Sequence, residues 1–234
     1  TYQDEHNKIV GQEEVFNSAQ PEQGQVPIPV QEVSAPVPEA SPRLPALQVI
    51  GQLAQTFILA EGEEGLFIID QHVAHERVLF ERLSAQAGEK GISSQVLLIP
   101  KTLELTLLEE ELLIKHILPL TDLGLVIEHF GPRTYLIRAV PAVVKEDPAD
   151  FLLALLQELE EKGDRISTAE IRKEVIVTAS CKGAIKAGDK ISLEAAQKLL
   201  EDLALCANPM TCPHGRPIVY KLTHQELLKV FQRI

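Results

Sequence analysis

Residues 65–81 read GLFIIDQHVAHERVLFE, and this stretch decides the fold around it. The apolar run that ends on Asp70 predicts a strand, and the residues that follow it, to about Gln86, predict a helix. His72 and Glu76 stand four residues apart, so they share one face of that helix near its N-terminus. An imidazole and a carboxylate so placed suit a borderline divalent ion such as zinc or manganese, although a capped helix with a hydrogen-bonded histidine is the commoner explanation of such a pair.

The same helical geometry sorts the other residues of this stretch. Leu79 and Leu83 continue the face that carries His72, which directs that face toward protein rather than bulk water. Glu81 lies about half a turn around the helix axis from His72, on the opposite side of the helix. We therefore expect it outside any ligand set that His72 joins.

A second cluster, CPHGRP, begins at Cys212. Cys212 and His214 stand two residues apart in a turn shaped by proline and glycine, and they form a compact pair of thiol and imidazole ligands. Arg216 suits a phosphate contact or an ion pair with a ligand carboxylate. The other two cysteines are expected to differ, since Cys206 is predicted to be a small core residue and Cys181 is either a metal ligand or a buried core thiol.

Six residues of these clusters offer nitrogen, oxygen and sulfur ligands enough for one or two metal ions: Asp70, His72, Glu76, Cys181, Cys212 and His214. A set that mixes carboxylates with thiols is unlike the cysteine-rich, closed set of a structural zinc finger. The sequence has no HExxH motif and no nucleophile elbow, which argues against an unrelated zinc hydrolase.

The whole chain has 234 residues, an apolar share of 45%, 24% charged residues and a formal net charge of −12. This composition is typical of a globular protein, and the acidic balance argues against a protein that coats nucleic acid without sequence preference. Its 3 cysteines, an odd number, argue against a disulfide framework and for a reducing compartment. No apolar run approaches the roughly 20 residues of a membrane span, and no secretory signal opens the chain.

The composition changes near Leu44. Residues 1–45 hold seven of the 15 prolines and carry a net charge of −5, which predicts a disordered linker between domains that is rich in proline and glutamine. Because the chain opens on Thr1, we expect it to be a piece of a longer protein. From residue 46 onward, strands and helices are expected in mixed order, so the predicted fold class is α+β.

Local signals place the remaining elements. Strands are expected at about 47–51, 56–60, 65–70, 93–100, 125–128, 134–139 and 216–221. Helices are expected at 107–117, after Asp147-Pro148, at 167–187, at 193–205 and after Thr223. Three of these helices open with capping boxes, formed by Thr106 with Glu109, Ser167 with Glu170 and Thr223 with Glu226.

Four segments occur in an order that resembles one known family: DQHVAHERVLFE, SCKGAIKAG, CPHGRP and Phe231-Gln232-Arg233. They are similar to the DQHA(X)2E(X)4E, ACR-type, CPHGRP and FXR motifs in the C-terminal domain of bacterial, endonuclease-competent MutL DNA mismatch repair proteins. The sequence departs from these motifs at Val73, where the family has alanine, and at Ser180 and Lys182, where it has alanine and arginine.

The resemblance implies a latent endonuclease that nicks one strand of duplex DNA near a mismatch. It implies Asp70, His72 and Glu76 as catalytic residues, and Asp70, His72, Glu76, Cys181, Cys212 and His214 as ligands of Zn²⁺ and/or Mn²⁺. Glu81, Arg216 and Lys182 are expected beside the ligands or against a DNA phosphate. The alternative is a non-catalytic dimerisation module of the MutL type with a structural zinc site.

A further segment, QVLLIP, spans residues 95–100. An extended apolar segment that stops at a proline is normally a buried strand. It also resembles the QXX[LI]XP peptide by which MutL endonucleases contact the sliding β-clamp, which implies that Gln95, Leu98, Ile99 and Pro100 bind the clamp. Of these two interpretations we favour clamp binding.

The resemblance also implies how the body is divided and what it binds. Residues 46–100 and 174–234 would form a sheet-bearing dimerisation subdomain with the metal site, and 101–173 a smaller, inserted α/β regulatory subdomain. The implied partners are duplex DNA, the sliding β-clamp, the mismatch-recognition protein MutS, a second copy of the chain and an N-terminal ATPase domain of the same full-length chain. No membrane is implied, and the expected location is the cytoplasm, in association with the nucleoid.

Overall fold

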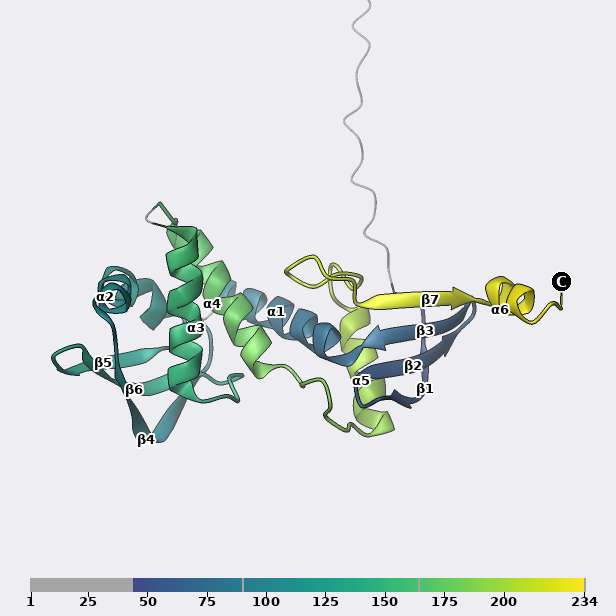
Figure 1. The fold of residues 1–234 in the computed structure, drawn as a ribbon, viewed down its shortest axis with the longest axis horizontal. Coiled ribbons are helices and arrows are strands. Elements are labelled where there is room, and N and C mark those ends of the chain that lie inside the picture. Colours follow the sequence, from purple (N-terminus) through teal and green to yellow (C-terminus); the bar gives the residue numbers. More distant parts are fainter. Residues whose placement is uncertain (1–43, 90, 164, 234) are drawn as a thin grey trace, which may run out of the picture. The chain divides into compact units, whose positions relative to one another are not determined.

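The computed structural model describes residues 44–89, 91–163 and 165–233, which belong to one compact unit of the chain (Figure 1). The linker expected at 1–45 lies outside the described residues, apart from its last two positions. The described part forms two antiparallel sheets and six helices, which confirms the α+β class. None of these helices has a stretch that is long and apolar enough to cross a membrane.

The first sheet has the strand order β1-β2-β3-β7. Its strands are β1 (Gln48–Leu53), β2 (Phe57–Gly62), β3 (Gly65–Asp70) and β7 (Val219–Thr223). Along β2 and β3, buried residues alternate with more exposed ones, so one face of the sheet packs inward. That face forms one hydrophobic core with α5 (Leu193–Ala204) and with the first half of α1 (Gln71–Glu89).

The second sheet has the strand order β4-β6-β5. Its strands are β4 (Ser94–Glu104), β5 (Val126–Gly131) and β6 (Thr134–Pro141). The helices α2 (Leu107–Asp122), α3 (Pro148–Lys162) and α4 (Thr168–Gly183) pack with this sheet around a second core. The short helix α6 (His224–Val230) follows β7.

Helix α1 contributes to both cores. Its Val78 is buried in the first core and its Leu83 in the second. Burying each of these side chains stabilises the fold by roughly 1.5–3 kcal/mol. Because α4 packs along α1, the residues that follow the DQH stretch lie beside those that surround Cys181 (Figure 1).

The helix ends confirm most of the local predictions. The three capping boxes, at Thr106, Ser167 and Thr223, are all formed, with each hydroxyl accepting a hydrogen bond from the backbone of the glutamate three residues later. Caps of this kind stabilise a helix by about 1 kcal/mol each. Asp147 caps α3 as predicted, and Phe231, of the FXR-like segment, ends α6 with its side chain exposed.

Several element boundaries differ from those expected, and helix α2 runs to Asp122 where an end at residue 117 was predicted. The helix predicted at 167–187 ends at Gly183, because Ala184 takes an extended backbone and the chain turns so that Ile185 meets α1. The strand predicted at 216–221 begins only at Val219, because Arg216 closes a loop onto Cys212 through a backbone hydrogen bond of 2.9 Å.

Strand β4 differs from its prediction in burial as well as in extent. The interpretation of 95–100 as a buried strand is wrong, since Leu98 is 97% exposed and Ile99 is 81% exposed. The pairing of β4 with β6 slips between Val96 and Lys101, so four residues bulge outward opposite one residue of β6. β4 also begins at Ser94, before the boundary expected at residue 101, and the division into two subdomains remains a prediction.

Candidate metal centre

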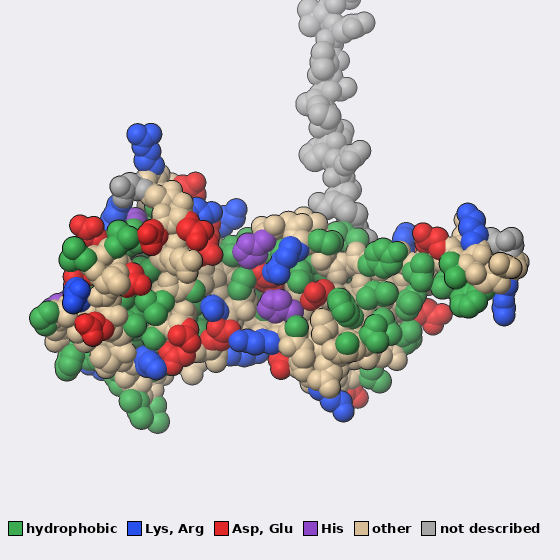
Figure 2. Space-filling model, viewed as in Figure 1, with side chains coloured by type: hydrophobic (Ala, Val, Ile, Leu, Met, Phe, Trp, Pro, Cys, Tyr) green, Lys and Arg blue, Asp and Glu red, His purple; other side chains and the backbone are tan. Residues whose placement is uncertain are grey.

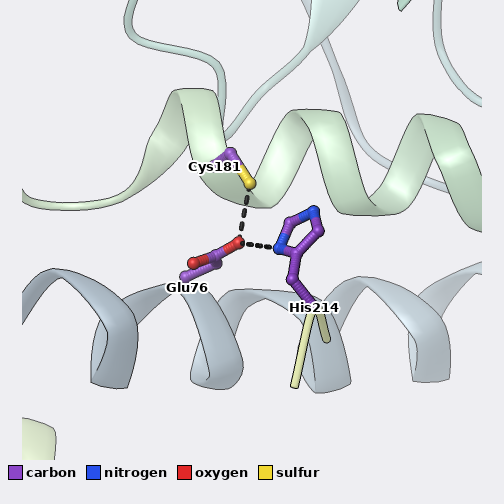
Figure 3. Close-up of side chains that lie close together, drawn as sticks. All are labelled: Glu76, Cys181 and His214. Atoms are coloured by element: carbon purple, nitrogen blue, oxygen red, sulfur yellow. Dashed lines mark hydrogen bonds and ion pairs between the residues drawn. The ribbon is translucent and has the colours of Figure 1, made fainter. Parts of the chain in front are cut away.

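The fully buried carboxylate of Glu76 lies at the centre of the site (Figure 3). Its Oε1 accepts a hydrogen bond from Sγ of Cys181 at 2.7 Å and lies 3.0 Å from Nδ1 of His214. Its Oε2 accepts a hydrogen bond from Nη2 of Arg216 at 2.9 Å. A buried carboxylate destabilises a protein unless its charge is compensated, so these contacts hold Glu76 in place.

Glu76, Cys181 and His214 come from α1, from α4 and from the loop before β7, and together they form a group that could hold a metal ion (Figure 3). One ligand atom of each residue lies within 4.8 Å of the others. Tetrahedral zinc keeps its ligand atoms roughly 3.4–3.6 Å apart. The oxygen, sulfur and nitrogen donors therefore fit a borderline divalent ion with small side-chain movements.

Binding of any such ion is coupled to loss of the proton from the Cys181 thiol. Burial, together with the hydrogen bond to Glu76, raises the pKa of the Cys181 thiol. Because the thiolate is the form that binds metal, an ion at this group must displace the proton that Cys181 shares with Glu76.

A tight turn places His214 beside Glu76. The N–H of Gly215 donates to the carbonyl of Cys212 at 2.9 Å, and Pro213 occupies the second position of this turn. Gly215 has a φ of +83°, in the left-handed region where glycine is favoured. The proline and glycine that the sequence places around His214 thus shape this loop, as predicted.

Arg216 connects the buried Cys212 to the group. Its backbone N–H donates to Sγ of Cys212 at 3.3 Å, while its guanidinium contacts Glu76. Of the two roles predicted for Arg216, the ion pair with a carboxylate is the one that the structure forms. Cys212 itself, 2% exposed, is not one of the three grouped ligands.

Two other predicted ligands are engaged elsewhere. Oδ1 of Asp70 accepts hydrogen bonds from the backbone N–H groups of His72 and Val73, both at 3.0 Å, so Asp70 caps α1. Nδ1 of His72 lies 2.7 Å from the carbonyl oxygen of Ile185. The structure therefore groups three of the six predicted ligands and leaves Asp70, His72 and Cys212 outside that group.

Glu81 holds the loop that carries the CPHGRP cluster. Its carboxylate accepts hydrogen bonds from the backbone N–H groups of Ala207 at 2.6 Å and Asn208 at 3.2 Å. Arg77, whose importance the sequence analysis missed, donates from Nε to the carbonyl of Thr211 at 2.7 Å. Glu81 is thus separate from the grouped ligands, as its place on the helix predicts, and α1 fixes both ends of the loop before Cys212.

Lys182 contacts an acidic residue that the sequence analysis did not single out. Its Nζ lies 2.9 Å from Oε2 of Glu146, and Lys186 pairs with the other oxygen of the same carboxylate. These pairs lower the pKa of Glu146. The three residues line a polar pocket of about 510 Å³ between the end of α4 and the segment before α3. No motif surrounds Glu146, so only the structure could reveal this pairing.

Gln71 is the third residue that the sequence analysis missed. It is fully buried, and its Nε2 donates to the carbonyls of Gln55 at 2.8 Å, Lys186 at 3.1 Å and Asp189 at 3.0 Å. It therefore ties the turn between β1 and β2 to the loop after α4. Its position between Asp70 and His72 in the sequence was the one signal that could have pointed to it.

Comparison with known proteins places this fold and site in context. A family model described as the MutL C terminal dimerisation domain matches residues 50–191. The DNA mismatch repair protein MutL of Desulforamulus reducens is 40% identical over 190 residues, which is 81% of this chain and 30% of that protein. The MutL of Pelotomaculum thermopropionicum is 42% identical over 195 residues, and that of Ligilactobacillus salivarius 38% over 194.

These alignments cover 82% and 83% of this chain but only 31% and 29% of the two relatives, so the chain spans less than a third of the length of the MutL proteins that it matches. The family model covers most of β1 and continues through α4, including the helix that bears Glu76. The chain belongs to the family of MutL C-terminal dimerisation domains.

Proposed function

We propose that this chain serves DNA mismatch repair as a latent, metal-dependent endonuclease that nicks one strand of duplex DNA. The observation that carries this proposal is the convergence of Glu76, Cys181 and His214 from three distant segments onto one buried carboxylate oxygen. Such a mixed donor set is typical of a site for a borderline divalent ion, and we propose Zn²⁺ or Mn²⁺.

Each residue of the site has a role in this proposal. A bound divalent ion would polarise a phosphodiester and lower the pKa of an attacking water. Glu76, Cys181 and His214 would hold the ion, with Asp70, His72 and Cys212 completing the ligand set as the family resemblance implies. Arg216 neutralises Glu76 and orients Cys212, and Glu81 fixes the loop of His214.

The test is nicking of supercoiled plasmid DNA by the 234-residue chain in the presence of Mn²⁺ and the sliding clamp. We expect open-circular DNA with the wild type and at least about tenfold less with Asp70→Asn or Glu76→Gln. Asp122→Asn, which removes an exposed carboxylate paired with Arg172, is the matched control and should nick normally. The proposal fails if the wild type forms no open circles, or if Asp70→Asn nicks as well as the wild type.

One observation favours a second candidate, a dimerisation module with a structural zinc ion. Asp70 and His72 both contact backbone groups. Asp70 caps α1, and His72 contacts the carbonyl of Ile185. A purely structural role predicts that removing the metal lowers the free energy of unfolding, while the loaded protein shows no nicking under any condition.

We further propose that residues 95–100 bind the sliding clamp. Leu98 and Ile99 project from the bulge of β4, where hydrophobic side chains stand out from the surface (Figure 2). An aliphatic side chain that the fold leaves exposed, beside Gln95 and Pro100, matches a peptide that enters a pocket on its partner. The exposure supports this interpretation because folding alone gives no reason for it.

We also propose that two copies of the chain associate through the outer face of the first sheet. Because Ile58, Ala60, Phe67 and Ile69 are buried, the alternate residues of β2 and β3 face outward. Apart from Glu61 and Asp70 at the strand ends, these are apolar: Phe57, Leu59, Leu66 and Ile68. Tyr220 and Leu222 of β7 lie beside Ile68 and Leu66 in the pairing. Hydrophobic side chains gather over this sheet in Figure 2. A contiguous apolar patch of this kind is typical of an isologous interface.

The remaining partners are proposals that follow from family membership. They are MutS and an N-terminal ATPase domain of the same full-length protein, and the cytoplasm is the proposed location. Because the net charge is −12, we expect recruitment to DNA to depend on these partners and on the clamp.

A further inference from the structure

Two histidines of α1 hold the backbone of Ile185. Nδ1 of His72 lies 2.7 Å from the Ile185 carbonyl oxygen, and Nδ1 of His75 accepts a hydrogen bond from the Ile185 N–H at 2.9 Å. A carbonyl oxygen can only accept and an amide N–H can only donate. His72 must therefore carry a proton on Nδ1, and His75 must have a lone pair on Nδ1.

This assignment determines what His72 can do. In the neutral ring with its proton on Nδ1, Nε2 keeps a lone pair, which is the form that binds a metal ion or accepts a proton. In the other tautomer, the lone pair of Nδ1 would face the Ile185 carbonyl oxygen across 2.7 Å, an unfavourable contact. The orientation of the backbone at Ile185 thus selects the tautomer of His72.

His75 controls the orientation of the Ile185 backbone by accepting the hydrogen bond from its N–H. Ile185 lies beyond the end of α4, where the chain has left the helix and has no continuous ladder of backbone hydrogen bonds to fix it. Two residues of α1 hold this loop: His75 takes the Ile185 N–H, and Gln71 donates to the carbonyls of Lys186 and Asp189. Gln52 and Gln55 bond to Asp189 and Gly188 farther along the loop. Removing the acceptor at His75 leaves the Ile185 N–H without this partner. The backbone at Ile185 can then rotate, while Gln71 keeps the rest of the loop in place.

We propose that His75 is a positioning residue, which acts through the Ile185 backbone to keep His72 in the Nδ1–H tautomer with Nε2 free. The consequence for metal binding rests on the proposed function, whereas the consequence for the tautomer does not. Partners that orient a metal-binding histidine typically contribute about 10–100-fold to metal affinity.

Two substitutions of His75 separate the acceptor from the bulk of the ring. His75→Asn places an amide oxygen where Nδ1 stands and keeps the acceptor, while His75→Leu removes it. The first readout is the ¹⁵N–¹H spectrum of the histidine side chains in the chelator-treated chain, with the His72 signals assigned by their loss in His72→Gln. We expect Nδ1–H for His72 in the wild type and in His75→Asn, and a shift toward Nε2–H in His75→Leu.

The second readout is the affinity for Mn²⁺, measured by calorimetry. We expect it to fall about tenfold in His75→Leu and to change less than about twofold in His75→Asn. His129→Asn, which alters an exposed histidine of β5, is the control and should leave the affinity unchanged. Rescue by asparagine but not by leucine identifies the acceptor, rather than the ring volume, as the property that matters.

The tautomer of His72 in the ¹⁵N–¹H spectrum is the result that confirms or overturns the proposal. A His72 ring with its proton on Nε2 in the wild type overturns it, and so does a His75→Leu variant in which His72 stays fully Nδ1–H. If His75→Leu does not fold, His75→Gln takes its place, because its longer side chain moves the acceptor away from Ile185. A wild type that binds no Mn²⁺ contradicts the proposed function alone, since the tautomer is read without metal.

Discussion

The carboxylate of Glu76 and the thiol of Cys181 are in direct hydrogen-bond contact, with Oε1 2.7 Å from Sγ, although 105 residues separate them in the sequence. The contact forms because α4 packs along α1, so that one helix presents the carboxylate and the other the thiol. The position of these two helices, and not the local sequence, creates the candidate metal centre.

The packing of α4 at Gly183 is expected to tolerate no side chain. A Cβ at this position would lie 2.4 Å from the carbonyl oxygen of Val143, a backbone atom that cannot move cheaply. We predict that Gly183→Ala lowers the free energy of unfolding by about 1–3 kcal/mol, measured by urea denaturation. Gly88→Ala, in α1 with open space around it, should raise it by up to about 1 kcal/mol. Equal effects of the two substitutions would contradict the packing described here.

The pH dependence of stability is expected to report on His75. Burial, reinforced by nearby positive charges, above all that of Lys145, lowers the pKa of His75 from an ordinary value near 6.5 to about 4. The unfolded chain therefore binds a proton at pH 5 that the folded chain does not. As a result, the free energy of unfolding should fall as the pH drops from about 6.5 toward 4.

We expect this loss to be about 2 kcal/mol, after allowance for the partial exposure of the ring. His75→Asn cannot titrate and should lack this component. The measurement is urea denaturation of both proteins across the same pH series. Parallel profiles for the two proteins between pH 6.5 and 4.5 would contradict the lowered pKa of His75.

The exposed bulge of β4 is expected to matter for binding and not for folding. Because Leu98 is 97% exposed, Leu98→Ala should change the free energy of unfolding by less than about 0.5 kcal/mol. The same substitution combined with Gln95→Ala should weaken binding to the sliding clamp at least tenfold, by about 1.4 kcal/mol or more, in a surface-plasmon-resonance titration. Leu118→Ala, an exposed leucine of α2, serves as the control, and unchanged clamp affinity in the double variant would refute the assignment.

The outer face of the first sheet is expected to hold two copies together. Ile68 and Tyr220 lie opposite each other on neighbouring strands of this face. A charge there would be buried without a partner in a dimer, so Ile68→Asp should convert the dimer to a monomer in sedimentation equilibrium. Val126→Asp, on β5 of the second sheet, should leave the mass unchanged. A wild type that sediments as a monomer would remove the basis for this interface.

The sequence predicted the local features of the fold well. Capping boxes such as that of Thr106 depend on residues three apart, and the CPHGRP turn depends on Pro213 and Gly215, so both can be recognised without tertiary structure. The alternation in β3 and the apolar faces of the helices likewise follow from local spacing. These signals sufficed for the α+β class.

The sequence could not predict which candidate ligands meet. Asp70, His72 and Glu76 are neighbours in one motif, yet only Glu76 joins Cys181 and His214. Asp70 caps the helix and His72 contacts Ile185, and both contacts depend on how α1 begins and where α4 ends. The exposure of Leu98 followed only from the resemblance to a clamp-binding peptide and not from the apolar pattern, because a bulge depends on the register with β6.

Metal content tests the central claim most directly. The purified chain, the Cys181→Ser variant and the Cys206→Ser variant should be incubated with Zn²⁺ and Mn²⁺, dialysed, and analysed by inductively coupled plasma mass spectrometry. Cys206 is the matched control, because it is a partly buried thiol outside the group of Glu76, Cys181 and His214. We predict about one ion per chain in the wild type and in Cys206→Ser, and a large loss in Cys181→Ser. A wild type without bound metal, or a Cys181→Ser variant that retains as much as the wild type, would contradict the account.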